Sequence, residues 1–343
     1  MIDRTSRAAG ALYGLAIGDA LGMPTQSLPR ALIMERYGEV LDGFHAGPAD
    51  QPLAAGMPAG SVTDDTEQAV LVARLLVSAG GTVDGRQLAD RLLAWEATMR
   101  ARGSLDLLGP STKRAIIELL DGTPIDETGR FGTTNGAAMR ITPVGIATPS
   151  GKPGLLLDRV VAVSATTHNT GLALAAAAAV AAAVSAGVDG ATVAEAIAVA
   201  VRAAEAGGRR GHWVAGADVA ARIRWATRLV GPANDTGPGS TPHRPGAVSE
   251  LLFDLVGTSL ASQESVPAAF AVLAAFGDDP WLACRLAASA GGDTDTIAAI
   301  VGAIAGACHG VEAFPLRARR TVAEVNQLEL DTLADELLAV RDA

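Results

Sequence analysis

The chain has 343 residues, of which 49% are hydrophobic but only 3% aromatic, and its formal net charge at pH 7 is -10. Contact with a nucleic-acid backbone requires clustered cations, so this acidic balance, with Lys113 and Lys152 as the sole lysines, argues against a nucleic-acid partner. Cys284 and Cys308 lie in no metal-binding or disulfide spacing, as is typical of a cytoplasmic protein. Much of the apolar share is alanine, the strongest intrinsic helix former, and a mostly helical chain is predicted.

Two apolar segments imitate membrane-directed sequences. Residues 8–18 follow a basic start, as in a secretory signal, but they run into Asp19 and carry glycines at every fourth position. Residues 172–187 are mostly alanine and short for a membrane span. We therefore expect two buried helices and no membrane partner.

Apolar residues recur with helical periodicity along the whole chain, whereas the period-two alternation of strands is hard to find. The pattern predicts helices over residues 6–19, 64–80, 86–100, 110–120, 170–187, 191–206, 217–229, 266–275, 280–289, 295–309 and 331–341. The sequence shows no repeat of fixed period, which argues against a helical solenoid. The Gly- and Pro-rich stretch at about 231–246 predicts a loop, which we interpret as a surface excursion from one domain spanning residues 1–343.

Two glycine stripes lie near opposite ends of the chain. Both have i, i+4, i+8 spacing, which allows close helix crossing: Gly10, Gly14 and Gly18, and Gly302, Gly306 and Gly310. Either the stripes pack against each other, or each packs against another helix. Mutual contact would place both chain ends in one domain.

Two acidic motifs each open a predicted helix. They combine carboxylates with hydroxyls: Thr63, Asp64 and Asp65 in the first, and Asp293, Asp295 and Thr296 after a glycine pair in the second. Capping explains one carboxylate at each start but not two, because adjacent carboxylates repel without a compensating positive group. Oxygen donors without His or Cys match hard cations such as magnesium, manganese or calcium. Facing motifs would form a two-metal hydrolase centre, although the spacing does not identify the bond that is cut.

Five sequence blocks resemble those of the ADP-ribosylglycohydrolase family, in the family's order. They are GLAIGDALGMP (14–24), TDDTEQAV (63–70), TNGAAMRITPVGI (134–146), TTHNTGLALA (166–175) and GGDTDTIAAIVGAIAGACHG (291–310). The resemblance implies an all-α, single compact orthogonal helical bundle with two divalent cations, Mg²⁺ or Mn²⁺. It also implies removal of ADP-ribose, or a related ribosyl group, from a protein side chain or small molecule. The metal ligands implied are Thr63, Asp64, Asp65, Asp293, Asp295 and Thr296.

The resemblance also implies a substrate-binding set. It comprises Asn135, Gly136, Ala138, Met139, His168 and Ser111. Small residues around Gly136 permit backbone N–H groups to face an anion, and Asn135 both donates and accepts. Two alternatives stay open: Arg140 is either a substrate contact or a structural ion-pair partner, and His168 is either a ligand contact or a helix cap. Thr167 and Asn169 flank His168 in the same block, and Thr112 follows Ser111.

Two positions bear on the general base. Asp106, in SLDLLGPSTKRA, resembles an aspartate of the dinitrogenase-reductase-activating branch and is predicted to orient or deprotonate the attacking water. One extra residue before Gly109 leaves a surface-loop role open. Gln26 stands where many relatives have a glutamate that is the proposed catalytic group in one branch. Because an amide is not a base, either that role shifts to Asp106 and metal-bound water or the activity is altered.

Three alternatives compete with this function. A terpenoid synthase would need aromatic walls around its carbocations, for which 3% aromatic content is poor. Hydrolysis of free nucleosides or other small N-ribosides would use the same centre. A non-catalytic ADP-ribose-binding protein would retain the fold without turnover. The sequence leaves open the substrate, the metal loaded and the oligomeric state.

Overall fold

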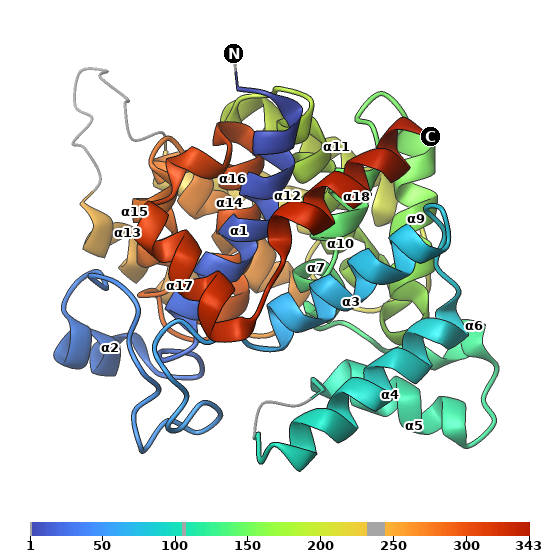
Figure 1. Cartoon of the computed structure of the whole chain (residues 1–343), viewed down its shortest axis with the longest axis horizontal. Helices are drawn as coiled ribbons and strands as arrows, with labels where there is room; N and C mark the ends of the chain where they lie inside the picture. The colour runs from blue at the N-terminus through green and yellow to red at the C-terminus, as the bar shows by residue number, and fades with distance from the viewer. Residues whose placement is uncertain (1, 105–107, 232–243) are drawn as a thin grey trace.

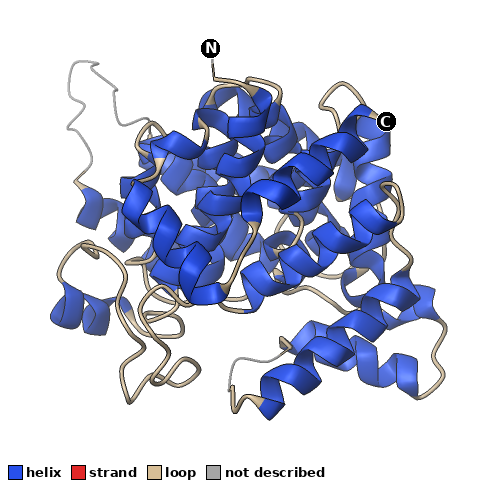
Figure 2. Ribbon diagram, viewed as in Figure 1, coloured by secondary structure: helices blue, strands red, loops and turns tan. Residues whose placement is uncertain are grey.

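The computed structural model describes residues 2–104, 108–231 and 244–343. The structure is 68% helical, and the described residues contain no strand, so the all-α prediction is confirmed (Figure 2). In chain order the elements are α1 (Arg4–Gly22), α2 (Arg30–Tyr37), α3 (Asp64–Ser78), α4 (Gly85–Ala101), α5 (Pro110–Leu120), α6 (Ile125–Thr128), α7 (Gly136–Met139), α8 (Thr142–Ala147), α9 (Pro153–His168), α10 (Gly171–Val188), α11 (Val193–Gly207), α12 (Val219–Val230), α13 (Pro245–Leu251), the π-helix η1 (Leu252–Val256), α14 (Ser262–Phe276), α15 (Pro280–Ala287), α16 (Thr294–His309), the 3₁₀-helix η2 (Val311–Ala313), α17 (Leu316–Asn326) and α18 (Leu330–Asp342).

Every helix predicted from apolar periodicity is present. The prediction did not include the short helices α2, α6, α7, α8 and α13, and it missed two longer ones, α9 and α17. The α9 segment contains the β-branched residues Val160, Val161 and Val163, which lower helix propensity. Packing overrides that preference, because Val160 and Val163 are fully buried. The α17 segment is mainly polar and buries only Ala318 and Val322, so its apolar stripe is too thin to recognise.

The two glycine stripes pack against each other along α1 and α16. A Cβ atom built on Gly14 would lie 2.0 Å from the carbonyl oxygen of Gly302, and one built on Gly18 would lie 2.0 Å from that of Ala298. The contacts run antiparallel, since Gly10 faces Gly306. Backbone therefore meets backbone, and no larger side chain fits between the two helices.

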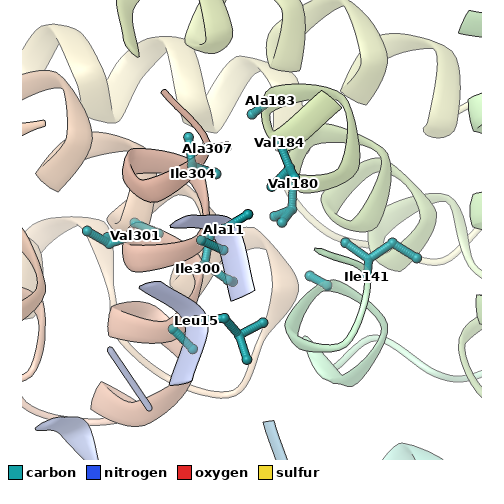
Figure 3. Packing of buried hydrophobic residues seen from close by; sticks show 14 of the residues in the cluster. Ala11, Leu15, Ile141, Val180, Ala183, Val184, Ile300, Val301, Ile304 and Ala307 are labelled. Carbon is teal, nitrogen blue, oxygen red and sulfur yellow. The ribbon is translucent and has the colours of Figure 1, made fainter. Parts of the chain in front are cut away.

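The alanine-rich helix α10 forms the second part of the core. Among the described helices it alone is long and apolar enough to cross a membrane by length and composition, and 94% of that stretch is buried within the protein. Figure 3 shows Val180 and Val184 of α10 near Ile300 and Ile304 of α16, with Leu15 of α1 beside them. Small alanine side chains let α10 pack closely on several neighbours at once.

The α1–α16 pair also sets the position of polar groups at one of its ends. Gly22, at the end of α1, faces the start of α16, where an added Cβ atom would lie 2.4 Å from the Cα atom of Asp295. In Figure 1, α2 lies at the lower left of the main bundle, whereas α4 and α5 lie at the lower right. The segments that lead into α2 and α5 supply further residues around the same place, as described next.

Candidate active site

The first acidic motif is capped by a residue from another helix. Thr63 precedes α3 in an extended conformation and makes no side-chain capping bond of its own. Instead, the buried carboxylate of Asp19 in α1 accepts hydrogen bonds from the backbone N–H and hydroxyl groups of Thr63 and Thr66, at 2.5 to 3.0 Å. Asp64 and Asp65 are therefore not needed as caps of α3.

Asp19 is a site residue that the sequence analysis did not identify. Burial raises its pKa to about 6, although the four donors from Thr63 and Thr66 oppose that rise. The sequence signal was its place in the block GLAIGDALGMP, but only the fold reveals which helix start it holds.

The second motif reaches its position through an unusual backbone path. Gly291 and Gly292 both have positive φ, at 89° and 78°, where other residues are strained. Gly292 exchanges backbone hydrogen bonds with Ser27 and Leu28, at 2.7 and 2.9 Å. A Cβ atom on Gly292 would lie 2.3 Å from the carbonyl oxygen of Thr258. The glycine pair thus threads between two segments and delivers Asp293 to the start of α16.

The two motifs meet directly. Thr296 donates from its hydroxyl to Oδ2 of Asp65 over 3.2 Å, across 231 residues of sequence. Both motifs line one cavity of about 260 Å³. Its walls comprise Gln26, Ser27, Leu53, Asp64, Asp65, Leu108, Gly109, Pro110, Thr112, Thr134, Asn135, Gly136, Met139, Leu260, Asp293, Asp295 and Thr296.

Burial and mutual repulsion dominate the electrostatics of this cavity. The pKa of Asp65 is raised well above its ordinary value, first by burial and then by the charges of Asp295, Asp64, Asp19 and Asp293. Burial also raises the pKa of Asp293 to about 6. These carboxylates act on one another, as expected where negative groups converge.

The donor chemistry fits hard divalent cations. Oδ1 of Asp65 is buried and has no hydrogen-bond partner, which is costly for a carboxylate oxygen unless a ligand engages it. In the described part of the chain, however, no group of three or more Asp, Glu, His or Cys side chains is already gathered to hold a metal ion.

The predicted substrate residues fall into two groups. Asn135, Gly136 and Met139 line the cavity. Asn135 donates through Nδ2 to Oδ2 of Asp293 and, over 2.9 Å, to the hydroxyl of Ser265. Ala138 is buried and does not line the cavity, and neither does Ser111, whose hydroxyl accepts from the backbone N–H of Thr134 over 3.4 Å.

His168 is fully buried and does not line the cavity. Its Nε2 lies 3.0 Å from the hydroxyl of Thr134, and its Nδ1 lies 2.7 Å from that of Thr167. Arg140 is also fully buried and does not line the cavity; it donates to Gln68 and Thr167 and forms no ion pair among the described residues. Asn169 instead donates to the backbone of Asp126, over 3.1 Å.

The two positions that bear on the general base are Asp106 and Gln26. Asp106 lies outside the described residues, as does most of the loop predicted over 231–246. Gln26 is 3% exposed and lines the cavity, and its Nε2 has no hydrogen-bond partner. A buried amide thus lies beside the carboxylates at position 26.

Comparisons with known proteins agree over nearly the whole chain. The family model described as ADP-ribosylglycohydrolase matches residues 1–343. An uncharacterized protein of Escherichia coli K12, YegU, is 34% identical over 338 residues, covering 98% of each chain. The ADP-ribosyl-[dinitrogen reductase] glycohydrolase of Rhodospirillum rubrum is 28% identical over 315 residues, covering 90% of this chain and 87% of that protein.

A solved structure is also similar. It is an ADP-ribosylglycohydrolase-related protein complex, 26% identical, with a TM-score of 0.66 and coverage of 98% of this chain and 99% of the other. The matched fold therefore extends across the helices that surround the cavity.

Proposed function

The chain belongs to the ADP-ribosylglycohydrolase family, and from this premise we propose that it is a hydrolase dependent on two divalent cations. Its substrate would be an N- or O-glycosidic bond that joins ADP-ribose, or a related ribosyl group, to a protein side chain or small molecule. The observation that carries the proposal is the hydrogen bond between Thr296 and Asp65, because it joins two acidic helix starts around one cavity.

The side chains of the two motifs would hold the ions. They are Thr63, Asp64, Asp65, Asp293, Asp295 and Thr296. Bound Mg²⁺ or Mn²⁺ supplies positive charge and lowers the pKa of water. Gln68 donates to Asp64 over 2.9 Å, and Asn135 donates to Asp293, so a neighbouring amide holds each of these two carboxylates in position. Asp106 stays the predicted group that orients or deprotonates the attacking water.

The size of the cavity bears on the substrate. At about 260 Å³ it is smaller than the roughly 300–1,000 Å³ of sites that enclose drug-sized ligands. It suits a ribosyl group, so the rest of an ADP-ribosylated substrate would extend beyond it. The same size favours hydrolysis of free nucleosides or other small N-ribosides as the second candidate function.

Product analysis separates these functions. The protein would be incubated with ADP-ribosyl-arginine, ADP-ribosyl-serine, ADP-ribose derivatives and plain nucleosides, each with Mg²⁺, Mn²⁺ or a chelator. We expect metal-dependent release of the group attached to ribose. Asp65→Ala and Asp293→Ala should abolish turnover while retaining helical content. Asp278→Ala, an exposed carboxylate outside the cavity, is the matched control and should remain active.

Each outcome has a clear meaning. Release from nucleosides alone would support the second candidate function. Full activity in Asp65→Ala, or activity that persists in chelator, would contradict the metal assignment. Tight ADP-ribose binding without turnover of any substrate would identify a non-catalytic binding protein.

A further inference from the structure

A chain of polar side chains connects the metal-ligand candidate Asp64 to Thr134, and both of these residues line the cavity. Gln68 Nε2 donates to Asp64 Oδ2 over 2.9 Å, and Arg140 donates to Gln68 Oε1 over 3.1 Å. Arg140 also donates to Thr167 Oγ1 over 2.7 Å. The contacts from Thr167 to His168 and from His168 to Thr134 complete the path. Gln68, Arg140, Thr167 and His168 are all buried.

Arg140 sets the direction of the hydrogen bonds on both sides. A guanidinium group donates and never accepts. The oxygens of Gln68 and Thr167 must therefore be acceptors toward Arg140. On the first side, this fixes the Gln68 amide with its NH₂ group toward Asp64.

On the other side of Arg140, the Thr167 hydroxyl accepts from Arg140 and must donate its own proton to another group. Its single proton has two acceptors within reach: Nδ1 of His168 at 2.7 Å and the carbonyl oxygen of Ser164 at 3.5 Å. The shorter contact is a normal hydrogen bond, whereas the longer one lies at the limit. Thr167 therefore donates to Nδ1, and a neutral His168 carries its proton on Nε2. Burial and the charge of Arg140 both lower the pKa of His168, which keeps the ring neutral.

The last hydrogen bond of this chain joins His168 to Thr134. The Nε2–H group of His168 donates to Thr134 Oγ1 over 3.0 Å, so the hydroxyl proton of Thr134 points elsewhere. Thr134 lines the cavity that holds Asp65 and Asp293. Its carbonyl group accepts from the Ser262 hydroxyl over 2.9 Å, which fixes the backbone at this position.

We infer that Thr134 is a substrate-binding residue whose hydroxyl donates to an oxygen atom of the bound ribosyl substrate. Arg140, Thr167 and His168 are positioning residues that fix this direction. The inference rests on the proposed function and identifies a contact at the same site. The acceptor is an oxygen lone pair, supplied either by the distal ribose or by the diphosphate.

Ligand binding tests the contact. Affinities for ADP-ribose and for ADP, which lacks the distal ribose, would be measured by calorimetry. Thr134→Val should weaken ADP-ribose binding about 10-fold, the typical effect of one lost hydrogen bond of this kind. Thr134→Ser retains the hydroxyl and should bind like the wild type. Thr133→Val makes the same change at a neighbour outside the cavity wall and should bind normally.

The two ligands distinguish the source of the oxygen. A loss for ADP-ribose alone indicates the ribose, and equal losses for both ligands indicate the diphosphate. Unchanged affinity in Thr134→Val, or no binding of either ligand to the wild type, would overturn the contact.

Nitrogen NMR of the ligand-free protein tests the direction independently of activity. The wild type should show His168 protonated on Nε2. Thr167→Val removes the donor to Nδ1 and should change the tautomer signal, whereas Thr167→Ser should restore it. Thr166→Val, another buried threonine of α9, is the control. Protonation of His168 on Nδ1 in the wild type would refute the proposed direction of the hydrogen bonds from Arg140 to Thr134. If His168 is protonated on Nε2 and Thr134→Val weakens ADP-ribose binding, but no substrate is hydrolysed, the proposed function fails and this inference stands.

Discussion

The contact between α1 and α16 and the cavity at one of its ends are both buried, but their physics differs. Along the contact, Gly14 meets Gly302 backbone to backbone, and burial involves no charge. At the cavity, by contrast, burial raises the pKa of Asp293 to about 6, and it does the same for Asp19, which holds the start of α3. One helix pair thus carries both uncharged backbone packing and buried carboxylates. The glycine stripe fixes the spacing of the helices, and the acidic start of α16 lies where α1 ends, with Gly22 against Asp295.

The largest effect is expected from breaking the glycine contact. In Gly14→Val, the new side chain would overlap the carbonyl oxygen of Gly302, which lies 2.0 Å from an ideal Cβ position. We expect a loss of at least about 3 kcal/mol in the free energy of unfolding, because backbone cannot yield as a flexible side chain can. Urea denaturation followed by circular dichroism would measure it.

Gly154→Ala is the matched control, since Gly154 lies in α9 with nothing within 4 Å of an added Cβ atom. That variant should be stabilised by up to about 1 kcal/mol. An unchanged urea midpoint for Gly14→Val would show that α1 and α16 do not pack as described.

The second prediction concerns the link between the two regions. Asp19→Asn replaces one acceptor oxygen with an NH₂ group that faces the donors of Thr63 and Thr66. We expect a loss of about 2 kcal/mol in the free energy of unfolding and a 10- to 100-fold loss in Mn²⁺ affinity. Asp84→Asn changes a carboxylate that caps α4, where asparagine serves equally well, and should affect neither quantity. Normal Mn²⁺ binding in Asp19→Asn would remove Asp19 from the site.

The third prediction sharpens the electrostatic contrast. The raised pKa of Asp293, about 6, favours the protonated native state, so in chelator its contribution to stability is present below pH 4 and is lost as the pH rises through 6. Metal binding needs the carboxylate form. The stabilisation by Mn²⁺, on the order of 2–3 kcal/mol at 100 times the Kd, should therefore shrink as the pH falls below 6. Thermal melts at pH 5 and pH 7.5, with and without Mn²⁺, would measure this. If the cavity holds no ion, Mn²⁺ should leave the melting temperature unchanged at both pH values.

The smallest effect is expected at Gln26. Gln26→Glu adds a carboxylate to the cavity wall, which should tighten Mn²⁺ binding by up to about 10-fold and destabilise the metal-free protein slightly. Gln87→Glu on the exposed surface of α4 makes the same change without effect. Weaker Mn²⁺ binding in Gln26→Glu would contradict this expectation and would show that the native amide supports metal binding better than a carboxylate does.

Much of the fold was predictable because its determinants are local. Apolar periodicity and alanine content indicated α10 and α16, but α17 was missed because its stability comes from packing that its own pattern does not announce. The acidic motifs were recognisable in the same way. Asp19 was not, because its partners Thr63 and Thr66 become neighbours only when α1 and α3 pack together. The burial of His168 behind Thr134 was equally invisible, since it depends on the tertiary contacts of α9.

The cavity draws its walls from two kinds of segment. The starts of α3 and α16 supply its carboxylates; the Asp19 side chain holds the first, and glycine backbone contacts hold the second. Other lining residues lie on connections: Leu108 and Gly109 before α5, and Gln26 and Ser27 after α1. Substitutions on these connections would therefore reshape part of the cavity wall without disturbing the α1–α16 packing that positions Asp293 and Asp295.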